Sequence, residues 1–145
     1  MNLMQRVAAI FGAAFLAGGA LGFTVTGFAM PTMHDSMENA PRMLGLFPLN
    51  VTHNLVHVAF GVWGLLAARG QRGSMTYALV SGVLYAILAG AGAFWPTMAG
   101  IVPMGGYDVG LHLAIAIVLI GCAVYAMTTE GDAPAPAASS IDARR

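Results

Sequence analysis

The sequence predicts an all-α integral membrane protein, an up-down bundle of four transmembrane helices with both termini in the cytoplasm. The first observation behind this prediction is composition: 58% of the 145 residues are hydrophobic and 8% are charged. An ordinary soluble domain has about 25% charged residues, so this chain has too few charges to cover a water-facing surface. The second observation is four apolar segments of membrane-spanning length, and the third is the distribution of the arginines.

Each apolar segment is close to the roughly 20 residues that an α-helix needs to cross a bilayer. A backbone in hydrocarbon must form its hydrogen bonds within its own segment, and the segments lack the alternation of a membrane barrel, so we expect helices. The expected spans are residues 7–30, 50–68, 75–95 and 108–127. They make residues 1–128 one transmembrane domain, and residues 129–145 are predicted to be a disordered cytoplasmic tail.

The arginines set the expected orientation. With four spans, one side of the membrane holds the amino end, the second loop and the tail, which carry Arg6, Arg69, Arg72, Arg144 and Arg145. The opposite side carries Arg42. Because basic residues near the spans favour the cytoplasm, we expect a multi-pass protein of the cytoplasmic (inner) membrane, with N-in and C-in. The net charge of zero leaves no basic patch for nucleic acid.

Small residues at four-residue spacing predict close helix packing. Gly18 and Gly22 form such a pair in the first span, and Gly82, Ala86 and Gly90 repeat the spacing in the third. Such faces let helix backbones approach each other in lipid. The expected partner of the bundle is the lipid bilayer; a membrane-protein partner or a second copy of the chain stays open.

A polar stripe runs along the second span. Its members fall within a sector of roughly 80° when successive residues turn by about 100°; they are Asn50, His53, His57, Gly61 and Gly64. Ionisable residues inside a span are costly and usually face the bundle interior or a water-filled cavity. We therefore expect this stripe to face protein rather than lipid.

The fourth span offers a second polar pair at a matching depth. Asp108 and His112 are spaced i, i+4 and so lie on one face. We expect Asn50 and Asp108 to be the N-caps of their helices. This places His53 roughly 4.5 Å, His57 roughly 10 Å and His112 roughly 6 Å below those caps. The three imidazoles are thus expected to converge near the periplasmic side, with the second and fourth helices in contact.

Three functions stay open for these residues. In the first, the protein is a structural or accessory bundle, and its histidines hydrogen-bond within a polar network with Asn50, Asn54 and Asp108. In the second, a metal ion or a haem group serves electron transfer or metal handling, and its ligands are His53, His57 and His112, joined for a metal by Asp108. The third is proton or solute handling, against which the absence of a visible broken helix counts. Soluble-enzyme motifs are absent, so an enzyme is the less expected class.

The first outer loop contains a run of soft donors. Met30, Met33, His34 and Met37 lie close together in it, and thioether ligands suit Cu(I). An amphipathic turn at the membrane interface explains the same residues without a metal. Both interpretations stay open.

Residues 44–57 contain an N-x-x-H-N-x-x-H segment that opens the second span, and residues 105–108 lead to His112 in a D-x-x-x-H spacing. With Tyr85 in the third span, this pattern resembles a family of small bacterial four-helix membrane proteins catalogued as a domain of unknown function. The resemblance implies the four-helix architecture and the membrane location. It also implies a shared motif at Asn50, His53, Asn54, His57, Asp108 and His112, but no reaction.

Overall fold

The structure, a computed structural model, describes residues 1–29, 37–97 and 101–131, and in these ranges the chain forms four helices and one small hairpin. The helices are α1 (Leu3–Thr26), α2 (Val51–Ala67), α3 (Gln71–Phe94) and α4 (Tyr107–Gly131). The hairpin pairs β1 (Arg42–Met43) antiparallel with β2 (Phe47–Pro48) just ahead of α2. The predicted helical fold class is confirmed, whereas the sequence pattern did not predict the hairpin.

The helices differ in length. Three of those described are long and apolar enough to cross a membrane: Leu3–Thr26, Gln71–Phe94 and Tyr107–Thr129. α2 has 17 residues, which at about 1.5 Å per residue gives roughly 25 Å, against a hydrocarbon core about 30 Å thick. The structure therefore contains three membrane-length helices and one shorter apolar helix, where the sequence predicts four similar spans.

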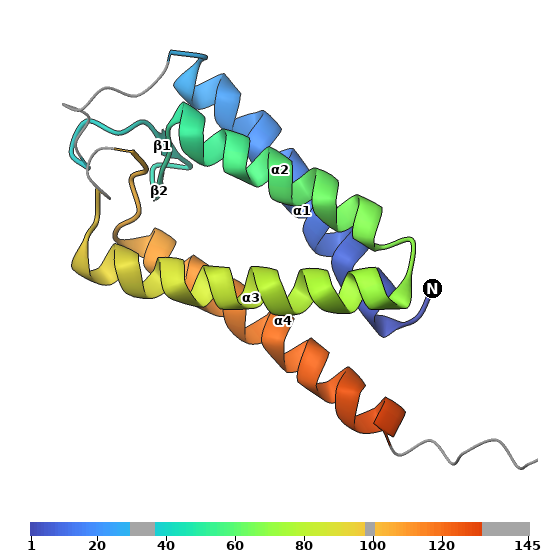
Figure 1. Ribbon diagram of the computed structural model, residues 1–145. Helices are drawn as coiled ribbons and strands as arrows, with labels where there is room; N and C mark the ends of the chain where they lie inside the picture. The colour runs from blue at the N-terminus through green and yellow to red at the C-terminus, as the bar shows by residue number, and fades with distance from the viewer. Residues whose placement is uncertain (30–36, 98–100, 132–145) are drawn as a thin grey trace, which may run out of the picture.

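The four helices pack mainly as two pairs, α1 with α2 and α3 with α4 (Figure 1). One end of the molecule, here called the turn end, carries the N-terminus, residues 68–70 and the end of α4 (Figure 1). The opposite end, called the loop end, carries the hairpin and residues 101–106 (Figure 1). α2 packs mainly on α1 and less on α3, so its expected contact with α4 is limited to side chains at the loop end, where the ring centroids of His53 and His112 are 5.9 Å apart. Side chains at the loop end link α2 to α4, as described below.

α1 and α2 approach closely because glycines lie where their backbones cross. A Cβ on Gly12 would lie 2.7 Å from a backbone nitrogen of α2, and one on Gly19 would lie 2.8 Å from the carbonyl oxygen of Asn54. Gly22 also faces α2, whereas a Cβ on Gly18 would approach nothing closer than 3.9 Å. The face of α1 that contacts α2 therefore contains Gly12, Gly19 and Gly22. Gly18, which the sequence pattern had placed on this face, is not part of it.

One of the two expected helix caps is present. Asn50 caps α2, since its Oδ1 accepts a hydrogen bond from the backbone nitrogen of His53 at 2.9 Å. α4 begins at Tyr107, so Asp108 lies in the first turn instead of at the N-cap. The left-handed φ of 65° at Gly106 turns the chain directly into the helix. In the first turn, a carboxylate still interacts favourably with the positive end of the helix dipole.

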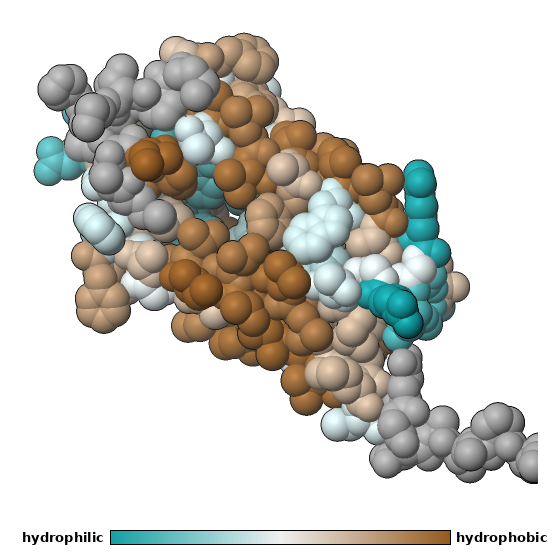
Figure 2. Space-filling model, viewed as in Figure 1, coloured by the Kyte–Doolittle hydropathy of each residue, from teal (hydrophilic) through white to brown (hydrophobic). Residues whose placement is uncertain are grey.

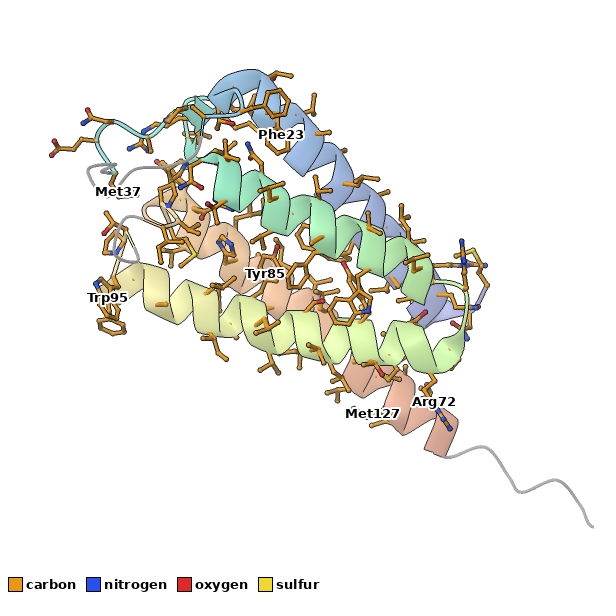
Figure 3. The ribbon with its side chains drawn as sticks, turned by 45° about the horizontal axis from the view of Figure 1, so that its top comes forward. Phe23, Met37, Arg72, Tyr85, Trp95 and Met127 are labelled. Carbon is orange, nitrogen blue, oxygen red and sulfur yellow. The ribbon has the colours of Figure 1, made fainter. Side chains whose placement is uncertain are left out.

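The outer surface of the helices is apolar. Figure 2 shows hydrophobic residues over the visible face of the helices and hydrophilic residues gathered at the turn end. Large aliphatic side chains such as Ile10 and Ile87 are more than half exposed, and an apolar surface of this extent is typical of a protein that binds a membrane or another protein. Figure 3 shows Tyr85 between the helices, with Trp95 at the loop end and Arg72 at the turn end.

Candidate metal centre

The first part of the site is the start of α2. Asn50 caps this helix, and its Nδ2 donates to the carbonyl oxygen of Ile101 at 2.8 Å, which ties the cap to the segment before α4. The cap sets His53 in the first turn of α2, where the residue is 3% exposed. The Nδ1 atom of His53 is buried and has no hydrogen-bond partner among the described residues. The His53 imidazole is thus buried, and its Nδ1 atom is not used by a hydrogen bond to the described residues.

The second part is the start of α4, where Asp108 and His112 contact each other one turn apart. The Nδ1 atom of His112 lies 2.7 Å from the backbone carbonyl oxygen of Asp108 and 3.2 Å from its Oδ2. A carbonyl oxygen can only accept, so Nδ1 carries a proton that it donates in the shorter contact. With that proton directed at the carbonyl, Oδ2 has no hydrogen-bond partner in the described part of the chain.

These two parts meet in one buried place. His53, Asp108 and His112 bring ligand atoms within 4.8 Å of one another. A tetrahedral zinc shell with bonds of about 2.0–2.1 Å separates neighbouring ligand atoms by roughly 3.4 Å. Ligand atoms within 4.8 Å of one another are therefore near the separation that such a shell requires.

His57 lies beside this group without belonging to it. Its ring centroid is 4.5 Å from that of His53, but the described residues that can share one ion are the other three. The Tyr85 ring stacks on His112, with centroids 5.0 Å apart and planes inclined by 23°. The geometry thus groups His53 and His112 with Asp108 and leaves His57 as a neighbour, while ligation of one ion by all three histidines stays a prediction.

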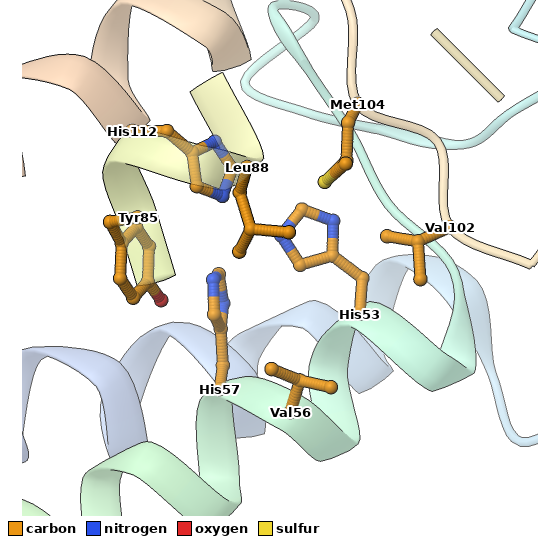
Figure 4. A pocket seen from close by; sticks show the side chains of 8 residues that line it. All are labelled: His53, Val56, His57, Tyr85, Leu88, Val102, Met104 and His112. Atoms are coloured by element: carbon orange, nitrogen blue, oxygen red, sulfur yellow. The ribbon is translucent and has the colours of Figure 1, made fainter. Parts of the chain in front are cut away.

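A pocket of about 100 Å³ adjoins the three residues. It is lined by side chains of α2, α3, α4 and the segment before α4 (Figure 4): His53, Val56, His57, Tyr85, Leu88, Val102, Met104 and His112. Pockets for drug-sized ligands occupy about 300–1,000 Å³. The pocket therefore suits an ion with a few small ligands and is too small for haem, the other cofactor that the sequence left open.

The asparagines lie apart from the imidazoles. Asn54 is fully buried but faces α1, where its Nδ2 donates to the Oγ1 of Thr26 at 2.8 Å. Its amide occupies the space beside Gly22. Asn50 bonds the backbone of α2 and of the neighbouring segment. The sequence led us to expect hydrogen bonds between the asparagines and the imidazoles. Instead, the Asn50 side chain bonds backbone groups and the Asn54 side chain bonds α1.

The family described as "Domain of unknown function (DUF4383)" matches residues 5–125. The chain belongs to this family. The match runs from α1 into α4 and contains every residue of the candidate metal centre. No curated protein and no solved structure matches the chain. The family of unknown function expected from the sequence is thus confirmed, and it assigns no reaction to these residues.

Several pocket residues were not identified as site residues from the sequence. Tyr85 carries the clearest signal, because a tyrosine inside an apolar span needs a place for its hydroxyl. Val102 and Met104 come from an irregular segment, and nothing in their local sequence indicates that they reach α2 and α4. Their contribution depends on how the two helix pairs meet.

Most of the methionine-rich run lies outside the described residues, namely Met30, Met33 and His34. Met37 is described, and its carbonyl oxygen accepts a hydrogen bond from the Nη2 of Arg42 at 3.0 Å. A Cβ on Gly105 would lie 2.7 Å from the terminal methyl of Met37. The Met37 side chain therefore packs against the segment before α4, and Cu(I) binding by the run stays a prediction.

Proposed function

We propose that the protein is a membrane-embedded binding protein for a divalent transition-metal ion, which His53, Asp108 and His112 hold. One observation carries the proposal: His53, Asp108 and His112, all buried, bring ligand atoms within 4.8 Å of one another, and Nδ1 of His53 and Oδ2 of Asp108 have no hydrogen-bond partner among the described residues. Buried polar groups are nearly always paired, and an unpaired one costs free energy. An ion between the two helices would give both atoms a partner.

The competing proposal is a structural bundle, in which the buried polar contacts only join the helices and bind no ligand. It predicts that the buried polar groups satisfy each other. Asp108 does contact one nitrogen of His112, through its backbone carbonyl oxygen at 2.7 Å and its Oδ2 at 3.2 Å, but neither contact involves His53. The structural role belongs instead to Asn54, which bonds Thr26 across the α1–α2 interface. Metal binding accounts for the two atoms near the imidazoles that hydrogen bonding leaves over, Nδ1 of His53 and Oδ2 of Asp108.

The donor set favours zinc or another divalent first-row ion. Two imidazole nitrogens and a carboxylate oxygen are ordinary zinc ligands. Calcium and magnesium prefer shells of oxygen, and Cu(I) prefers soft sulfur donors. Met104 brings one thioether to the pocket wall, but the three converging groups are nitrogen and oxygen donors. Zn²⁺ is therefore the test ion.

The proposed setting is the cytoplasmic membrane, with both termini inside and the loop end facing the periplasm. Arg6, Arg69 and Arg72 belong to segments at the turn end, whereas Arg42 belongs to the hairpin, and basic residues favour the cytoplasmic side. α2, with 17 residues, is at the short limit of the about 17–25 residues found in spanning helices. Near the first turns of α2 and α4, the metal centre would lie just below the periplasmic interface.

Zinc content tests this proposal. Full-length protein purified in detergent without chelator and equilibrated with Zn²⁺ should hold about one ion per chain by elemental analysis. His53→Ala and His112→Ala each remove one ligand from a three-residue set, so the affinity should fall by more than about 100-fold. Circular dichroism should show unchanged helix content in both variants.

His34 provides the matched control, because its replacement by alanine removes a histidine that does not belong to the proposed ligand set. His34→Ala should hold as much zinc as the unaltered protein. Zinc-free protein after equilibration would contradict the proposal. Zinc that remains in His53→Ala and His112→Ala but is lost in His34→Ala would move the binding site to the first outer loop.

A further inference from the structure

We propose that the bound metal ion keeps one exchangeable coordination position, which faces the pocket and takes a small anion of hydroxide or azide size. The inference rests on the proposed metal binding and goes beyond it. A site closed by protein ligands only stabilises a fold, whereas a site with an open position can bind and activate a ligand. The inference therefore distinguishes an ion that only stabilises the fold from one that can bind a further ligand.

The protein ligands fall short of a full tetrahedral shell. Among the described residues, the group of histidine, cysteine and acidic side chains that can share one ion contains His53, Asp108 and His112. Structural zinc sites use four protein ligands, whereas catalytic sites use three and leave the fourth position to water or substrate. Cys122 is free, but it lies roughly 15 Å further along α4 than His112 at about 1.5 Å per residue. Three protein ligands leave one position open.

The open side of the shell faces the pocket. His53 and His112 both line the pocket, and Figure 4 shows each ring turning a nitrogen toward the space between them. Asp108 is not among the lining residues. An ion bound by all three would therefore have the carboxylate behind it and the pocket in front.

The pocket walls suit a small anion. The exposed wall of the pocket is almost entirely apolar, with Val56, Leu88 and Val102 among its residues, and the volume of about 100 Å³ restricts the ligand to a few non-hydrogen atoms. Two polar side chains line the pocket without belonging to the ligand group, His57 and Tyr85. Figure 4 shows the Tyr85 hydroxyl on the side of the pocket where His57 lies. A hydroxyl donor in a water-poor site stabilises an anion beside it.

Azide binding to the Co²⁺-loaded, full-length protein tests the inference. Co²⁺ occupies zinc-type sites, and its visible absorption depends on its ligands, so azide should change the spectrum in a saturable way. Tyr85→Phe keeps the ring that stacks on His112 and removes the hydroxyl. This variant should hold as much Co²⁺ as the unaltered protein and bind azide about 10-fold more weakly or worse.

Tyr77→Phe is the matched control. Tyr77 lies on the same helix, is as buried as Tyr85, and is not among the residues that line the pocket. Its replacement removes a hydroxyl from the bundle interior at a distance from the proposed ligand. The azide affinity and the Co²⁺ content of this variant should both equal those of the unaltered protein.

The possible failures separate the two proposals. A Co²⁺-loaded protein whose spectrum does not respond to azide would overturn the open position and leave metal binding intact, with His57 or Met104 closing the shell. Protein that binds no Co²⁺ would overturn both. Equal azide affinity in Tyr85→Phe and the unaltered protein would contradict the placing of the anion in this pocket.

Discussion

Asp108 makes two contacts with His112 that have different consequences. The backbone carbonyl oxygen, 2.7 Å from Nδ1, fixes the tautomer of the imidazole and does not depend on the aspartate side chain. The carboxylate Oδ2, 3.2 Å from the same nitrogen, is the atom available to an ion. Replacing the carboxylate by an amide therefore changes the metal ligand without changing the group that orients the ring.

Asp108→Asn should lower the Zn²⁺ affinity by about 10–100-fold. The amide has a similar shape but carries no negative charge, so it is a weaker ligand and a weaker electrostatic partner for the ion. Competition with a chelator of known affinity measures the change. An affinity equal to that of the unaltered protein would remove Asp108 from the metal centre.

Metal binding should weaken as the pH falls. Imidazole binds metal in its neutral form and takes up a proton near a pH of about 6.5. Protons therefore compete with the ion at His53 and His112, and the bound zinc should be released as the pH falls. Equilibrium dialysis from pH 8 to pH 5, with circular dichroism as a check of folding, measures this release. Zinc retained at pH 5 by folded protein would mean that other ligands hold it.

At the residue scale, the sequence predicted what depends on local spacing. The cap at Asn50 and the contact between Asp108 and His112 follow from positions three and four residues apart, and both are present. The role of His57 did not follow, although it shares a face of α2 with His53. Which of two imidazoles on one face reaches Asp108 depends on where α4 begins, and no spacing within α2 contains that information.

The α1–α2 interface contains an interhelical hydrogen bond among its apolar contacts. The Asn54 amide fits beside Gly22, and its Nδ2 donates to the Oγ1 of Thr26. A Cβ on Gly22 would overlap the Asn54 side chain. The amide could yield only by giving up its bond to Thr26, so glycine at this position and asparagine on the facing helix depend on each other.

Gly22→Ala should therefore lower the free energy of unfolding by about 1–3 kcal/mol. Thermal unfolding in detergent, followed by circular dichroism, measures the effect. Gly121→Ala on α4 is the control, because a Cβ at that position would meet nothing within 4 Å, and it should be neutral or slightly stabilising. Equal stability of the two variants would show that the Asn54 amide is free to rearrange.

At the element scale, the sequence predicted the small-residue helices but not the faces they use. Gly82 does pack against a neighbour, since a Cβ there would lie 2.6 Å from Ile120 of α4, whereas a Cβ on Gly90 would meet nothing within 4 Å. A four-residue spacing identifies faces that permit close approach. The partner helix then decides which of these faces is used, and its position is a long-range property.

The candidate metal centre lies where the two helix pairs meet. His53 comes from the α1–α2 pair, and Asp108 and His112 come from the α3–α4 pair. Composition and apolar length predicted the number of helices, because lipid imposes a hydrophobic surface and a minimum length. The sorting into pairs and the shortness of α2 were not predicted, since four apolar helices permit several pairings of similar composition.

The proposed orientation predicts the behaviour of reporter fusions. A reporter that is active only in the periplasm should be inactive when fused after Arg72, at the turn end, and active when fused after Tyr107, at the loop end. The reason is the excess of arginine at the turn end. The reverse pattern would place the metal centre on the cytoplasmic side, and activity at both positions would mean that α3 does not span the membrane.

X-ray absorption at the zinc edge tests the metal centre most directly, because it reports the atoms bound to the ion. Zinc-loaded protein should show nitrogen and oxygen neighbours at about 2.0–2.2 Å, with the outer-shell scattering of two imidazole rings. His112→Ala should lose one ring from that pattern or hold no zinc. A shell without imidazole, or one dominated by sulfur at about 2.3 Å, would contradict binding by His53, Asp108 and His112.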